Sequence, residues 1–118
     1  MRRLALLALA ALLGGCAVEE EHPVVELLVG GSVPRASITW RDGGGVHHQS
    51  GAELPWRVRF EAEPGTDVMV LARSLDLEAR LWIVVEEDGR EVRNVPGCLC
   101  DGESVTVQAQ GNVGDWEF

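Results

Sequence analysis

The sequence lacks several features that often identify a protein's class. It contains no lysine and no tyrosine, only two phenylalanines and three cysteines, so four tryptophans carry most of its aromatic surface. Its apolar run at residues 4–13 has ten residues, whereas a helix that crosses a bilayer needs about 20. It has no nucleophile elbow with an ordered Ser-His-Asp set, no phosphate-binding loop and no H-E-x-x-H motif. The sequence therefore predicts neither a membrane-spanning helix nor an enzyme.

The chain is strongly acidic, with 10 basic and 19 acidic residues and a formal charge of −9. Nucleic-acid-binding proteins need basic patches, so this balance argues against a nucleic-acid partner. It also argues against a domain that lies flat on an anionic lipid surface. All ten basic residues are arginine, which we attribute to coding bias rather than to chemistry.

The first 16 residues have the pattern of an export signal. Met1-Arg2-Arg3 carries positive charge, the apolar run follows, and the segment ends in Leu13-Gly14-Gly15-Cys16. This ending resembles the lipobox of bacterial lipoproteins. The resemblance implies that Cys16 receives a diacylglycerol, that cleavage occurs just before it, and that acyl chains hold the mature protein on a membrane. Two or more chains give stable anchoring, because each buried CH₂ contributes about 0.8 kcal/mol.

Four segments follow from this interpretation. Residues 1–15 are the signal peptide, 16–23 the lipidated cysteine and acidic tether, 24–110 one folded domain, and 111–118 an unassigned tail. Cleavage leaves eight arginines against 19 acidic residues, a formal charge of −11. Seven tether residues reach at most about 25 Å, so the domain stays close to its membrane. We expect the outer membrane in a diderm host, and otherwise the outer face of the cell membrane.

The domain consists of short alternating segments separated by turns, which predicts strands and no helices. Seven or eight such strands with turns about every ten residues are typical of a two-sheet, immunoglobulin-like sandwich. The antibody-type Cys…Trp…Cys spacing is absent, so Trp, Val, Leu and Ile must form the core. The expected strands are residues 24–29, 36–42, 46–50, 56–62, 68–75, 79–87, 90–95 and 104–110.

The segment 56–62 alternates most clearly. Arg57 and Arg59 share one of its faces, and we expect them to pair with carboxylates across the sheet. The opposite face is apolar and should point to the core; it carries Trp56, Val58, Phe60 and Ala62.

The order of four pieces resembles the mycobacterial small membrane proteins of the MmpS type and their lipoprotein relatives. The pieces are "ASITW", "LPWRVRFEAEPG", "VMVLARS" and "IVVEEDGREV", and together they fall within residues 24–110. The resemblance implies a β-sandwich on the outer face of a membrane that assists transporters of the RND class. Members of that family keep a transmembrane helix where this chain has a lipobox.

Cys98 and Cys100 have the most unusual spacing in the chain. Nearby cysteines in exported proteins are usually oxidised, and a bend allowed by Gly97 and Gly102 would let this pair form a disulfide. Two separate thiols, or a metal site, remain alternatives. The metal alternative adds His47 and His48, because thiolate and imidazole suit copper(I) or zinc. Adjacent strand residues point to opposite faces, so at most one of these histidines could join a single site.

Two hypotheses of function follow. The first is a non-enzymatic, membrane-anchored accessory protein that binds another envelope protein, with an RND-type transporter as the partner implied by the resemblance and no cofactor besides the lipid on Cys16. The second is a small metal-binding or thiol-redox module built on Cys98 and Cys100. A structural or carbohydrate-binding role would rest only on analogy between folds.

Overall fold

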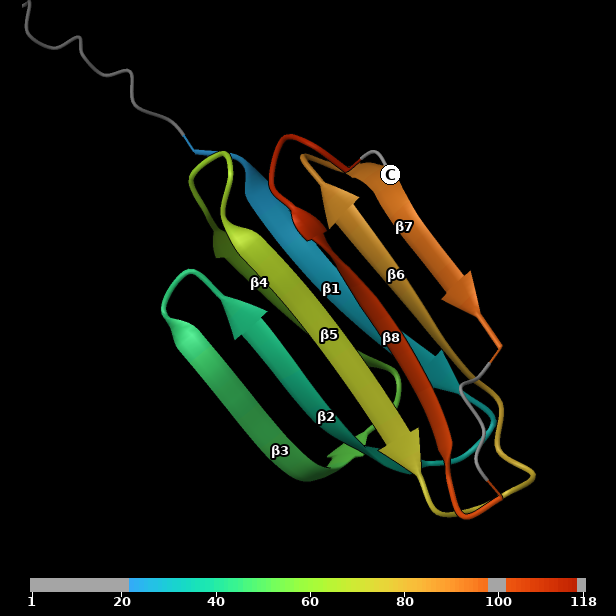
Figure 1. The fold of residues 1–118 in the computed structure, drawn as a ribbon. Coiled ribbons are helices and arrows are strands. Elements are labelled where there is room, and N and C mark those ends of the chain that lie inside the picture. Colours follow the sequence, from blue (N-terminus) through green and yellow to red (C-terminus); the bar gives the residue numbers. More distant parts are fainter. Residues whose placement is uncertain (1–21, 98–101, 117–118) are drawn as a thin grey trace, which may run out of the picture.

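Eight strands make up the part of the chain that the computed structural model describes, residues 22–97 and 102–116 (Figure 1). All neighbouring strands pair antiparallel. The strands are β1 (Val24–Gly31), β2 (Arg35–Asp42), β3 (Gly45–Glu53), β4 (Trp56–Glu61), β5 (Asp67–Ser74), β6 (Leu81–Glu87), β7 (Arg90–Pro96) and β8 (Val105–Asn112).

The strands form two four-stranded sheets that pack face to face. The first, sheet 1, has the order β4-β1-β6-β7, and the second, sheet 2, has the order β3-β2-β5-β8. Buried residues from both sheets join one apolar core. The two-sheet sandwich of short antiparallel strands predicted from the sequence is therefore confirmed.

The sandwich has two ends, which are useful landmarks (Figure 1). The chain enters β1 at one end, here called the entry pole, which also holds the Asp88-Gly89 hairpin and the turn at residues 63–66. The other end, the far pole, holds the β1–β2 turn at residues 32–34, the loop at residues 75–80 and the end of β7. A strand of eight residues separates the poles by about 26 Å.

Alternation along each strand places the core, as expected from the sequence. In β1 the inward side chains of Val25, Leu27 and Val29 are at most 1% exposed, while the intervening residues are half-buried. In β4 the predicted division also holds, since Arg57 and Arg59 are exposed and Trp56 is buried. β6 lies between β1 and β7, in agreement with its apolar middle.

The loop between β5 and β6 differs from the prediction, which placed residue 75 in one strand and residues 79–80 in the next. Side-chain oxygens end β5 here: the Ser74 hydroxyl accepts a hydrogen bond from the Asp76 N–H at 3.1 Å, and the Asp76 carboxylate accepts one from the Glu78 N–H at 2.9 Å. These bonds bend the backbone, so Leu75 leaves the sheet and β6 begins at Leu81.

The C-terminal residues that the sequence left unassigned continue and close the fold. β8 runs to Asn112, Val113 is 1% exposed, and Trp116 packs against the core. Trp116 also lies beneath the guanidinium of Arg93, 5.4 Å from its ring centre. In the described residues, no helix is long and apolar enough to span a membrane.

Candidate functional site

Trp82 is the bulkiest of the exposed apolar side chains at the far pole, and 44% of its surface is accessible. It stands on the outer face of sheet 1, where its residue pairs with Gly30 of β1 on one side and Pro96 of β7 on the other. The indole lies directly over Gly30: a β-carbon added there would fall 2.5 Å from the ring nitrogen. The missing side chain of Gly30 therefore makes the space that this ring occupies.

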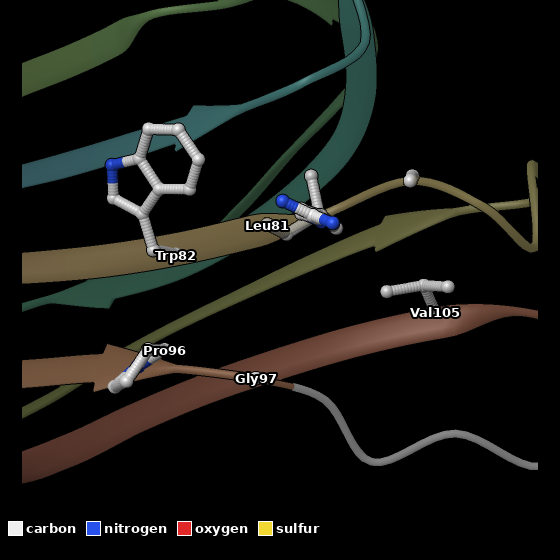
Figure 2. Close-up of a pocket in the computed structure, with 7 residues that line it drawn as sticks. Leu81, Trp82, Pro96, Gly97 and Val105 are labelled. Carbon is white, nitrogen blue, oxygen red and sulfur yellow. The ribbon is translucent and has the colours of Figure 1, made fainter.

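A pocket of about 410 Å³ opens beside Trp82. Figure 2 shows its labelled walls, which come from the start of β6, the end of β7 and the start of β8. Among the described residues, nearly all the lining side chains are apolar and the single charged one is Arg80. The described lining residues are Ala79, Arg80, Leu81, Trp82, Pro96, Gly97 and Val105.

The backbone of Arg80 is held firmly at the rim of this pocket. Its N–H donates to the Ser32 hydroxyl at 2.9 Å, and its carbonyl accepts from the Ser32 N–H at 2.9 Å. Gly31 approaches the same carbonyl so closely that a β-carbon there would lie 2.8 Å from it. The guanidinium of Arg80 forms no ion pair with any residue in the described ranges.

A second group of aromatic rings lies along the open side of the sandwich, between edge strands β3 and β4. The ring of His47 stacks on Trp40 with centres 5.0 Å apart and planes 25° apart, and Trp40 meets Trp56 at 4.9 Å. The Trp56 indole N–H donates to Gln49 Oε1 at 3.3 Å. The group joins the two sheets, because Trp40 and His47 belong to sheet 2 and Trp56 belongs to sheet 1.

Asp42 fixes the orientation of His47 in this group. Its carboxylate accepts hydrogen bonds from the Gly44 N–H at 2.7 Å and from His47 Nε2 at 3.0 Å. Partial burial raises the pKa of Asp42, but the bonds from Gly44 and His47, together with the positive charge of the ring, lower it by more. The net pKa lies below its ordinary value of 3.8.

The two candidate histidines do not converge. His47 faces Asp42 and Trp40, whereas His48 contacts Thr39 Oγ1 at 2.8 Å and Ser50 Oγ at 3.2 Å. The strand geometry thus separates them, as the sequence predicts. Among the described residues no three His, Cys, Asp or Glu side chains are grouped to hold a metal ion.

The three cysteines lie outside the described residues. For Cys98 and Cys100, the disulfide, the separate thiols and the metal site therefore all stay predictions, as does lipidation of Cys16. Gly97, which precedes Cys98, is at the far pole, while His47 is near the entry pole on the opposite sheet.

One of the predicted cross-strand ion pairs is present. Arg57 Nε lies 3.0 Å from Glu26 Oε2 on the outer face of sheet 1. The Arg57 side chain is 66% exposed, so the pair contributes at most about 1 kcal/mol to the stability of the fold. We interpret it as an ordinary surface ion pair and not as part of a binding site.

Comparisons with known proteins place few limits on function. No protein-family model matches the sequence, and a search of curated proteins returned no match. Among solved structures, the chain is similar to vCBM60, solved in its selenomethionine form in work on circular permutation between two families of calcium-dependent carbohydrate-binding modules. The similarity covers 76% of this chain and 91% of that one, at 9% identity and a TM-score of 0.49. At this level we draw no functional conclusion from it.

Sequence reasoning did not single out the pocket beside Trp82. The one available signal was Trp82 itself, because the alternation places this large apolar side chain on the outward face of a strand, where polar residues are expected. The other walls come from residues 79–82, 96–97 and 105, and no local pattern predicts that these segments meet.

Proposed function

We propose that this chain is an exported envelope lipoprotein, held on a membrane by acyl chains on Cys16, whose sandwich is a non-enzymatic interaction domain. The leader, the lipobox and the acidic tether support the anchor. The polarity of the folded domain supports the interaction role and is the observation that carries the proposal.

That polarity places three of the four large exposed apolar side chains of the described residues away from the tether, while the fourth, Val46, lies near the entry pole. The chain enters at the entry pole, while Leu75, Leu77 and Trp82 are 74%, 55% and 44% exposed at the far pole. Single exposed apolar residues are ordinary, but three at one end of a small domain form a surface suited to a protein partner. An anchored domain would present this end outward, about one strand length beyond the end nearest the membrane.

The entry pole carries several exposed acidic side chains. Glu61, Glu63, Asp88 and Asp115 are exposed there. Anionic headgroups repel such a surface, which favours a domain that stands off the bilayer on its tether. The resemblance to the MmpS-type proteins supports a transporter of the RND class as the partner.

The anchor is tested by mass spectrometry of the mature protein and by membrane fractionation. We expect a thioether-linked diacylglycerol on Cys16, and we expect Cys16→Ser to release the protein from the membrane fraction. An unmodified thiol at position 16, or a membrane-bound Cys16→Ser protein, would overturn this part of the proposal.

The partner surface is tested by photocrosslinking in membranes of the native host. A photoreactive residue at Leu77 should give a discrete adduct with another envelope protein. Val46 is the matched control, since it is 62% exposed but lies on edge strand β3, away from the far pole. Equal adducts from both positions, or none from Leu77, would contradict the assignment of the far pole.

A further inference from the structure

We infer that the pocket beside Trp82 binds a small amphiphilic monoanion, an aliphatic or aromatic body that carries one carboxylate. This inference does not depend on the lipid anchor or on a protein partner, because it rests on the walls of the pocket alone. Its volume of about 410 Å³ falls within the usual range for small-molecule sites, about 300–1,000 Å³.

The lining of the pocket favours a ligand whose main part is apolar. Leu81 and Val105 are 2% and 3% exposed, so the floor of the pocket is continuous with the core of the domain. Pro96 lines the pocket at the end of β7 and Trp82 lines it at the start of β6, with the indole turned away from Pro96 in Figure 2. Apolar groups that enter such a site leave water at about 25 cal/mol per Å² of buried surface.

The rim of the pocket favours a ligand with a negatively charged group. Of the lining residues that the structure describes, Arg80 alone is charged, and its guanidinium forms no ion pair with another described residue. A guanidinium offers a carboxylate a planar, two-pronged hydrogen-bonding partner. An ammonium headgroup would instead meet like charge, so the site should discriminate against cationic amphiphiles.

The pocket is largely preorganised, because the backbone of Arg80 and the ring of Trp82 are already held in place. Ser32 holds the Arg80 backbone from both sides, and Gly30 seats the Trp82 ring. A ligand therefore orders little more than itself and the end of the Arg80 side chain, which lowers the entropic cost of binding.

The test is an NMR titration of the mature chain, residues 16–118, with Ser in place of Cys16. Butanoate, hexanoate and octanoate are the probes, used below their aggregation limits, with octylamine and octanol as charge controls. We expect saturable shifts of the Trp82 indole N–H, identified by Trp82→Phe, and of the Gly97 and Val105 amides. Affinity should rise with chain length, by up to about fourfold for each methylene that becomes buried.

Variants separate the apolar and ionic contributions. Arg80→Gln should weaken octanoate about threefold, as expected for an exposed ion pair, and leave octanol unchanged. Arg90→Gln, an exposed arginine at the entry pole, is the matched control and should change neither. Trp82→Ala should weaken both octanoate and octanol.

Three results would overturn the inference. They are the absence of saturable shifts at Trp82, an octylamine affinity equal to that of octanoate, and shifts of the same size at Val46, which would show non-specific adsorption. Loss of the anchor on Cys16 changes none of these measurements, so this inference and the proposed function can fail separately.

Discussion

Trp116 donates a hydrogen bond from its indole nitrogen to the carboxylate of Glu87, at 2.6 Å, and so ties the last described residue to the end of β6. The same carboxylate oxygen accepts the Gly114 N–H at 2.8 Å. Glu87 is only 8% exposed, and these two contacts from the C-terminal turn supply hydrogen-bond donors to its buried carboxyl group. The turn is thus part of the domain and not a loose extension.

Removal of this carboxylate should destabilise the fold. Glu87→Ala leaves two donors without their acceptor, and we expect a loss of about 2 kcal/mol in the free energy of unfolding. Urea denaturation followed by tryptophan fluorescence measures it. Glu63→Ala, an exposed glutamate at the entry pole, should stay within about 0.5 kcal/mol of the parent. Equal effects of the two substitutions would show that the contact with Trp116 contributes nothing.

The two neighbouring glycines at the end of β1 should respond differently to alanine. At Gly31 a methyl group meets the Arg80 carbonyl, a backbone atom that cannot rotate away, and we expect a loss of about 2 kcal/mol. At Gly30 it meets only the Trp82 ring, which can swing into solvent, so the loss should be below about 1 kcal/mol. Gly30→Ala should nevertheless shift the Trp82 indole resonance strongly, and an unmoved resonance would contradict the stacking.

Asp42 should give the domain part of its acid sensitivity. Because its folded-state pKa lies below the ordinary value of 3.8, its contribution is complete above that pH and is lost as the pH falls through the folded pKa. Asp42→Asn should therefore lower stability at neutral pH by about 1 kcal/mol, with the gap narrowing below pH 3.8. Asp115→Asn, exposed at the same pole, is the control for a general charge effect. A gap that stays constant down to low pH would refute this role.

The cysteine pair calls for a chemical measurement. We expect Cys98 and Cys100 to resist maleimide labelling under denaturing conditions until they are reduced, as a disulfide predicts. Because the closed loop is very short, reduction should lower the unfolding midpoint only slightly. Two labelled thiols without reduction, or a bound metal ion released on denaturation, would favour the alternatives.

The sequence was most informative where local alternation and burial agree. In β4, every second residue from Trp56 onward is apolar, and this alternation identified the face that points to the core. The consecutive glycines and the Asp88-Gly89 pair indicated turns. Such signals depend only on nearest neighbours and on a two-residue period. They also sufficed for the fold class.

What the sequence could not show depends on contacts between distant segments. The turn at residues 113–116 forms because Glu87 lies 29 positions before Trp116 and offers its carboxylate there. The pocket arises because β6 begins where β7 ends and β8 starts. The early end of β5 followed from side-chain bonds of Ser74 and Asp76 that alternation does not detect.

The indole above Gly30 also helps to fix the register of β1 against β6 in sheet 1. A slip of β1 by two residues would keep its core face inward but bring Leu28 or Ser32 opposite Trp82, and neither leaves room for the ring. Gly30 therefore leaves only one register of β1 against β6 in which the Trp82 ring has room. The apolar alternation along β1 alone would not distinguish this register from one shifted by two residues.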